Sequence, residues 1–149
     1  MKVKVRTLIL LSIIALIAFS CVDRKQEVRW YSDIDSVVAI AKATGKPILV
    51  EFYATWCPYC KALEDSTFTD NMVKEYFKKF VNVRIDVDKK PEVANQMNAN
   101  ARKYGGVGIP NILFLDPDKN KIRHIIGYYL PDKLCAVMDT VLMGFYKNR

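Results

Sequence analysis

Apolar and polar residues alternate along this chain with two periods, one helical and one strand-like, from Asp33 onward. Short apolar runs rich in strand formers are typical of strands buried within a sheet. We expect strands at residues 47–53, 81–87, 111–115 and 121–126. Apolar residues at i, i+3, i+4 and i+7 predict amphipathic helices. We expect helices at residues 33–44, 59–67, 71–80, 92–104 and 131–146.

Residues with special backbone preferences mark the ends of these elements. Asp33, or Ser32 before it, can cap the first helix, and Gly45 ends it. Asp70 begins a second helical piece after a break, and Pro91 suits the first position of the next helix. The order is α-β-α-β-α-β-β-α, in which a βαβ unit joins a β-hairpin. This pattern predicts an α/β fold with a central mixed sheet and helices on both faces.

The first twenty residues differ in composition from the rest of the chain. Lys2, Lys4 and Arg6 precede an apolar run from Leu8 to Phe19. Positive charges followed by a short apolar stretch and a small residue are the layout of a secretory signal peptide. The run is shorter than the roughly 20 residues that a membrane-spanning helix needs. We therefore expect a cleaved signal at residues 1–20, with an uncleaved anchor as the alternative.

The end of this run bears on how the protein is held in place. Ala18-Phe19-Ser20-Cys21 resembles a bacterial lipoprotein processing box, in which the cysteine becomes the lipidated first residue. Phe19 is bulkier than is usual there, so an ordinary signal peptide with an incidental Cys21 is the alternative. A polar stretch follows, and we interpret residues 21–30 as a tether and residues 31–149 as one globular domain.

The charge of the chain points away from nucleic acid. The formal net charge is +7, and removal of residues 1–20 takes away three positive charges and leaves +4. The basic residues are scattered, and they form neither a run nor a basic patch with interleaved aromatic residues. A domain of this size with such a charge has an ordinary solvated surface, and we expect no nucleic-acid partner.

The chain contains four cysteines, Cys21, Cys57, Cys60 and Cys135. Cys57 and Cys60 directly follow a predicted buried strand and begin a predicted helix. Unpaired N–H groups and the partial positive charge of a helix N-terminus favour a thiolate on the first cysteine. The spacing lets the second sulfur attack a mixed disulfide on the first. Pro58 between them stiffens the loop without removing a needed hydrogen-bond donor.

Two other uses of a Cys-x-x-Cys pair are less consistent with the sequence. Half of a zinc site needs two more ligands with suitable spacing, and Cys21, Cys135 and His124 do not form such a pair. A structural disulfide over so short a loop constrains the unfolded chain little. We therefore predict redox chemistry, with no metal and no cofactor beyond the disulfide itself. Cys135 is interpreted as a buried inert residue and His124 as a structural one.

Two separated motifs carry a resemblance to a known family. The stretch from Val50 to Lys61, VEFYATWCPYCK, resembles the active-site strand and helix of the thioredoxin superfamily. The stretch from Lys103 to Pro110, KYGGVGIP, resembles its cis-proline loop. Gly45-Lys46-Pro47 and Thr67-Phe68-Thr69-Asp70 make the chain most similar to the thioredoxin-like domains of the electron-transfer protein DsbD. The likeness covers about Trp30 to Met143 and implies a thioredoxin fold for residues 31–149.

The resemblance implies roles for individual residues. Cys57 is expected to be the exposed nucleophile that forms a mixed disulfide, and Cys60 the buried thiol that resolves it. Glu51 stands where thioredoxins have a buried acid, and it is expected to accept the proton of Cys60. A carboxylate in an apolar strand is costly to bury unless its pKa is raised, which agrees with this role. A charge on the surface at the strand end is the alternative for Glu51.

Further residues are expected to shape the surface that meets a substrate. In the resemblance, Trp56 packs on the active-site loop, with Pro58 and Tyr59 beside it. Pro110 is expected to follow a cis peptide bond, which leaves the Ile109 backbone free to pair with an extended substrate segment.

The sequence also departs from the family pattern at positions near the site. Thioredoxins carry a lysine on the next strand facing the buried acid, whereas Asn82 stands at that place here, with Arg84 two residues on. Asn111 follows Pro110 where threonine is more usual. The proton path of this chain is therefore expected to differ from that of thioredoxin.

These observations predict an exported thiol–disulfide oxidoreductase on the periplasmic side of a bacterial membrane, lipid-anchored at Cys21. Its substrates would be disulfides in exported proteins. Because an oxidising compartment keeps paired thiols oxidised, a reductant there needs an electron supply, and a membrane donor of the DsbD kind is the implied partner. Two alternatives stay open: an oxidase or isomerase that uses the same site, and a binding module with an idle dithiol.

Overall fold

The computed structural model describes residues 27–102 and 108–147. The predicted signal peptide, Cys21 and most of the predicted tether lie outside the described residues, as does part of the expected cis-proline loop. Among the helices of the described ranges, none is both long enough and apolar enough to cross a membrane.

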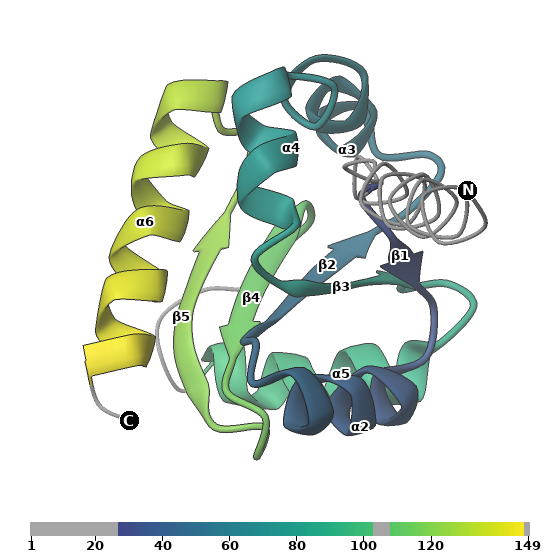
Figure 1. Ribbon diagram of the computed structural model, residues 1–149. Coiled ribbons are helices and arrows are strands. Elements are labelled where there is room, and N and C mark those ends of the chain that lie inside the picture. The colour runs from purple at the N-terminus through teal and green to yellow at the C-terminus, as the bar shows by residue number, and fades with distance from the viewer. Residues whose placement is uncertain (1–26, 103–107, 148–149) are drawn as a thin grey trace, which may run out of the picture.

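Five strands form one mixed sheet at the centre of the molecule (Figure 1). They are β1 (Trp30–Tyr31), β2 (Ile48–Tyr53), β3 (Val81–Asp86), β4 (Asn111–Leu115) and β5 (Lys121–Ile126). The order across the sheet is β1-β3-β2-β4-β5. β3 runs parallel to both β1 and β2, whereas β4 is antiparallel to β2 and to β5. The predicted βαβ unit and hairpin are therefore confirmed.

Helical segments cover both faces of this sheet, as Figure 1 shows. They are α2 (Ile34–Thr44), α3 (Pro58–Ala62), the π-helical turn η1 (Leu63–Thr67), α4 (Asn71–Phe77), α5 (Pro91–Arg102) and α6 (Pro131–Lys147). One apolar core joins α2 and α5 to the sheet, and a second joins η1, α4 and α6 to its other face. The structure thus confirms an α/β fold with a central mixed sheet between two helical layers.

The alternation of β2 decides where the buried acid lies. Ile48, Val50 and Phe52 belong to the core under α2 and α5, while Leu49 belongs to the core under η1, α4 and α6. Successive side chains of a strand point to opposite faces, so Glu51 shares the face of Leu49. The acid therefore lies under the helical segments that follow the two cysteines.

The predicted helix ends are borne out by their hydrogen bonds. The Asp33 carboxylate accepts the Ser36 N–H at 2.8 Å, and the Asp70 carboxylate accepts the Met72 N–H at 2.8 Å. Gly45 ends α2 in the left-handed conformation, with φ of 67°, which glycine adopts without strain. Local side-chain chemistry thus fixes where α2 and α4 begin.

Two features of the fold differ from the sequence prediction. Trp30 and Tyr31 form the edge strand β1, so the chain joins the sheet inside the range predicted as tether; a two-residue strand leaves no periodic pattern. The predicted helix 59–67 is interrupted by a π-helical turn, in which the Phe68 N–H donates to the Leu63 carbonyl at 2.9 Å. The Thr67 hydroxyl in this turn donates to the Tyr129 carbonyl at 2.6 Å.

Candidate active site

The Cys57–Cys60 disulfide lies where the chain passes from the sheet into a helix. The chain leaves β2 at Tyr53, turns through a hydrogen bond from the Cys57 N–H to the Ala54 carbonyl, and enters α3 at Pro58. Cys57 is the N-cap of α3, and its sulfur accepts the Cys60 N–H at 3.2 Å. The backbone therefore directs a donor at the sulfur of the first cysteine.

Both cysteines are buried in this oxidised structure. Cys57 is 4% exposed and Cys60 is 3% exposed, so the expectation of an exposed Cys57 is wrong for the disulfide form. The reason is that the bonded sulfurs pack in a small apolar cluster with Ala54, against which the side chains of Tyr53, Val87 and Ile109 lie. Attack on the disulfide therefore needs a partner group that fits closely against this cluster.

Two large aromatic side chains project from the surface beside the buried disulfide. Trp56 is 67% exposed and Tyr59 is 65% exposed. The Trp56 indole N–H donates to the Asp88 carboxylate at 2.7 Å, which ties the ring to the turn after β3. Asp88 was not singled out from the sequence, because nothing in its spacing links it to a residue 32 positions earlier. Its placement follows from the pairing of β2 with β3.

The predicted cis-proline loop reaches the same place from another part of the chain. The Ile109–Pro110 peptide bond is cis, and the Ile109 side chain packs against the disulfide cluster. The Pro110 carbonyl accepts the Gly127 N–H at 2.8 Å. Asn111 after it is 1% exposed, and its amide has no hydrogen-bond partner within the described part of the chain. Residues about fifty positions apart thus meet at the sulfurs.

Glu51 is fully buried behind this surface, which rules out the alternative of a surface charge. One carboxylate oxygen pairs with Nε of Arg84 at 2.6 Å. Neither oxygen makes a hydrogen bond of good geometry among the described residues, so Oε2 has only this ion pair and Oε1 has no partner. Burial raises the pKa of Glu51 to about 7, against the lowering effect of the Arg84 guanidinium. The site therefore holds a carboxyl group able to exchange a proton near neutral pH.

Arg84, and not Asn82, is the residue that faces the buried acid. In the parallel pairing of β2 with β3, Glu51 lies opposite Arg84 and Leu49 lies opposite Asn82. Asn82 donates instead to the Phe77 carbonyl at 2.9 Å. The sequence comparison set Asn82 at the place of the thioredoxin lysine, whereas the register places Arg84, two residues on, opposite the acid. The partner became identifiable only with the register.

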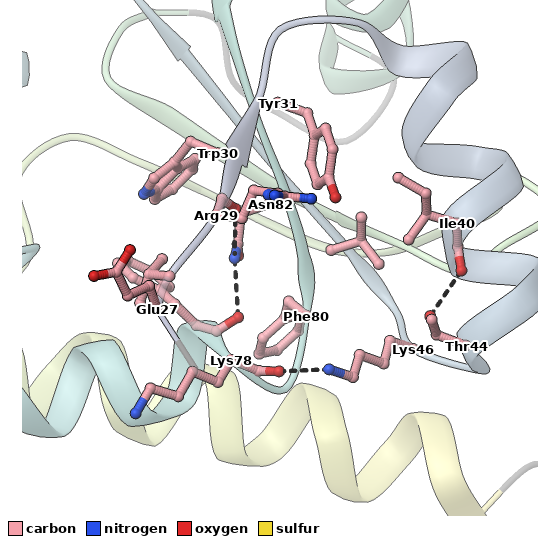
Figure 2. Close-up of a pocket in the computed structure, with 13 residues that line it drawn as sticks. Glu27, Arg29, Trp30, Tyr31, Ile40, Thr44, Lys46, Lys78, Phe80 and Asn82 are labelled. Atoms are coloured by element: carbon pink, nitrogen blue, oxygen red, sulfur yellow. Dashed lines mark hydrogen bonds between the residues drawn. The ribbon is translucent and has the colours of Figure 1, made fainter. Parts of the chain in front are cut away.

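Asn82 belongs to a pocket remote from the disulfide, shown in Figure 2. This pocket has a volume of about 660 Å³ and lies between β1, the ends of α2 and α4, and the first residues of β3. Figure 2 shows the Lys46 ammonium directed at the Lys78 carbonyl, a hydrogen bond of 2.8 Å that closes one wall. None of the residues singled out for redox chemistry lines it.

Cys135 and His124 lie away from the disulfide region. Cys135 is unbonded and 6% exposed on α6, and burial raises the pKa of its thiol. His124 lies on β5 opposite Leu113, and burial lowers its pKa. Among the described residues, no group of three or more metal-binding side chains comes together.

The part of the chain that contains Glu51, Cys57 and Cys60 is similar to known proteins. The profile of a thioredoxin-like family matches residues 29–117, more than half of the chain. DsbD of Ralstonia nicotianae, a thiol:disulfide interchange protein, is 33% identical over 118 residues, which cover 78% of this chain and 19% of that protein. DsbD of Yersinia enterocolitica is 36% identical over 86 residues, 56% of this chain and 14% of that protein. The chain thus spans less than a fifth of these relatives.

Solved structures share the fold at lower sequence identity. A thioredoxin from Thermus thermophilus superposes with a TM-score of 0.65 at 24% identity, covering 78% of this chain and 88% of that one. The reduced C-terminal domain of DsbD from Neisseria meningitidis gives a TM-score of 0.58 at 24% identity, covering 71% and 90%. With the sheet order, the Cys57–Cys60 disulfide and the profile match all in agreement, the chain belongs to the thioredoxin-like family.

Proposed function

We propose that this chain is an extracytoplasmic thiol–disulfide oxidoreductase that reduces or exchanges disulfides in exported proteins. The observation that carries the proposal is the Cys57–Cys60 disulfide at the start of α3, with exposed aromatic residues in front of it and a buried acid behind it. The Cys57–Cys60 pair itself carries the electrons, so the proposed reaction uses no further cofactor.

The proposed reaction begins with the reduced pair. The Cys57 thiolate attacks one sulfur of a substrate disulfide, which forms a mixed disulfide and releases one substrate thiolate. The Cys60 thiolate then attacks the Cys57 sulfur, which releases the second substrate thiolate and restores the Cys57–Cys60 disulfide. Two electrons pass to the substrate, and the dithiol loses two protons. The Cys60 N–H that now points at the Cys57 sulfur stabilises negative charge there in the reduced form.

Glu51 is the proposed acceptor of the Cys60 proton. Glu51 lies on the sheet face that η1 covers. The turn η1 directly follows α3, the helix that carries Cys60. The raised pKa of Glu51, about 7, matches the pH at which it must take up and release a proton. A carboxyl with an ordinary pKa of 4.5 would be a much weaker base at neutral pH.

The exposed aromatic residues are the proposed contact with protein substrates. Trp56 and Tyr59 present large rigid surfaces, which are common anchors in protein interfaces. The Ile109 backbone beside the disulfide cluster is the proposed partner of an extended substrate segment. Pro58 holds the first turn of α3 between these contacts.

The proposed location and electron donor come from the N-terminal segment and the DsbD relatives. Residues 1–20 would direct export, and lipidation of Cys21 would hold the domain at the periplasmic side of a membrane. Tethering raises the local concentration near a membrane donor. A dithiol donor of the DsbD kind would reduce the Cys57–Cys60 disulfide after each cycle.

The test is a trap in the native host with the full-length chain. A Cys60→Ala variant cannot resolve its mixed disulfide, so substrate proteins should remain attached to Cys57 and be released by reductant. The matched control is Cys57→Ala/Cys60→Ala, which should capture none. Identification of the captured proteins would show whether they are exported proteins and a membrane donor.

The alternatives predict other outcomes of the same experiment. A binding module with an idle dithiol would give no reductant-sensitive conjugates with Cys60→Ala. An oxidase acts from its Cys57–Cys60 disulfide, so the lone Cys57 thiol of Cys60→Ala would form no conjugates with reduced proteins, and the wild type would equilibrate at a much more oxidising potential than thioredoxin in a glutathione buffer. Either result would reject the proposed reductive direction.

A further inference from the structure

We infer that the exposed Glu64 is a positioning residue of this site: it holds the Arg84 guanidinium that pairs with the buried Glu51 and draws part of its positive charge away from that acid. The inference rests on the proposed role of Glu51 as the proton acceptor. It goes beyond that role because it names the groups of this chain that set how readily Glu51 holds its proton.

The geometry of Arg84 shows the division directly. Its Nε lies 2.6 Å from a carboxylate oxygen of Glu51, and its Nη1 lies 2.8 Å from Oε1 of Glu64. The three residues come from three elements: Glu51 from β2, Arg84 from β3 and Glu64 from η1. A planar guanidinium can hold two carboxylates in fixed directions at once, which the single ammonium of lysine does not do.

Aromatic contacts hold the guanidinium in this position. Its central carbon lies 4.4 Å from the centre of the Tyr53 ring and 5.7 Å from that of the Trp30 ring. Such cation–π contacts stabilise a partly desolvated arginine. The side chain of Arg84 is 20% exposed, between fully buried Glu51 and 53% exposed Glu64. Arg84 therefore joins a buried carboxylate to one in contact with solvent.

The two neighbours act on Glu51 in opposite directions. Arg84 lowers the pKa of Glu51 and Glu64 raises it, while burial is the largest cause and also raises it. Of the other elements next to Glu51, β4 places Ile112 opposite it, and α3 carries the disulfide, which is uncharged in the oxidised form. Lys61 on α3 acts on Glu64 and lowers its pKa further. Removing Arg84 or Glu64 should therefore shift Glu51 in opposite directions.

The experiment is a carbon-13 NMR titration of the Glu51 carboxyl in the oxidised full chain. Glu51→Gln identifies the signal by its loss. We expect Arg84→Gln to move the titration midpoint of Glu51 to higher pH, by about 1–3 pH units. We expect Glu64→Gln to move it to lower pH, by a smaller amount because Glu64 is half-exposed.

Control variants separate this effect from a general structural one. Glu75→Gln removes another exposed glutamate, which pairs with Lys78 on the next turn, and should leave the Glu51 midpoint unchanged. Arg84→Lys keeps the charge and loses the two-directional fork, so its midpoint should lie between those of the wild type and Arg84→Gln. A structural defect alone would not move the midpoint in opposite directions in two variants.

The inference is overturned if Glu64→Gln leaves the midpoint unchanged or raises it, a result that stands even if Arg84→Gln does not fold. It is equally overturned if both variants shift the midpoint in the same direction. A disulfide-exchange assay on the wild type is read separately. If the wild type exchanges disulfides but the Glu51 midpoints do not shift in opposite directions, only the inference is rejected. If the midpoints shift in opposite directions but the wild type exchanges no disulfides, only the proposed function is rejected.

Discussion

Within the part of the chain that the structure describes, buried cysteines lie in two regions, which differ in their surroundings. Cys57 and Cys60 are 4% and 3% exposed, and Cys135 is 6% exposed. Cys57 caps a helix and accepts a backbone N–H, whereas Cys135 lies inside the first turns of α6 within the apolar core shared with Leu134 and Met138. Exposure therefore does not separate the redox pair from the lone thiol.

What separates the two regions is the position of charge and of aromatic surface. Behind the redox pair lie a buried carboxyl and its arginine, and in front of it lies the exposed ring of Trp56. Burial raises the pKa of Cys135, and the nearby carboxylates of Asp70 and Asp132 raise it further, which disfavours its thiolate. The buried acid and the exposed aromatic ring thus distinguish the proposed exchange site from the thiol packed in the core.

The largest expected effect comes from removing one sulfur in each region. Cys57→Ala should reduce disulfide exchange to the uncatalysed background, because no nucleophile remains at the start of α3. Cys135→Ala should leave the exchange rate within about twofold, because Cys135 lies outside the cluster around the disulfide. Rates with a protein disulfide substrate measure both. A rate for Cys135→Ala as low as that of Cys57→Ala would remove the distinction between the regions.

A smaller effect should appear in the pH dependence of stability, at the buried acid of the redox region. The pKa of Glu51 is raised from 4.5 to about 7 in the folded protein, so between these values the folded state binds more protons than the unfolded one. The contribution of Glu51 to stability is therefore fully present below about pH 4.5 and is lost as the pH rises through 7. Its size is on the order of 3 kcal/mol.

Urea unfolding of the oxidised protein at pH 4 and pH 8 measures this contribution. The free energy of unfolding of the wild type, relative to that of Glu51→Gln, should be lower at pH 8 than at pH 4. Glu75→Gln, at an exposed pair on α4, should show no comparable dependence. If the wild type and Glu51→Gln showed the same pH dependence, or if the wild type gained stability relative to Glu51→Gln at pH 8, folding would not raise the pKa of Glu51.

The sequence predicts the fold well because its elements are locally encoded. The strands at 111–115 and 121–126 occur with the predicted bounds, since apolar runs and the turn between them are local features. The caps Asp33 and Asp70 are equally local. The short strand β1 was missed because two residues show no period, and its place depends on pairing with β3.

The site was predictable in its chemistry and less so in its partners. The spacing of Cys57 and Cys60 and the acid at Glu51 are visible along the chain. The partners of Glu51 are not, because Arg84 is brought to it by strand register and Glu64 by the helical turn after the dithiol. Asp88 reaches Trp56 for the same reason. Long-range contacts of this kind follow from the tertiary structure, not from a motif.

The smallest expected effect concerns the aromatic–carboxylate pair that each region contains. Trp56 donates to Asp88 at 2.7 Å beside the disulfide, and Tyr76 donates to Asp139 at 3.3 Å near Cys135. Asp88→Asn weakens the hydrogen bond that orients the exposed indole, so binding of a protein substrate should weaken by about 2- to 10-fold. The free energy of unfolding should change by less than about 0.5 kcal/mol. Asp139→Asn should leave substrate binding unchanged. Equal KM increases for both variants would show that Trp56 is not a specific anchor, because only Asp88 orients a ring at the surface that meets the substrate.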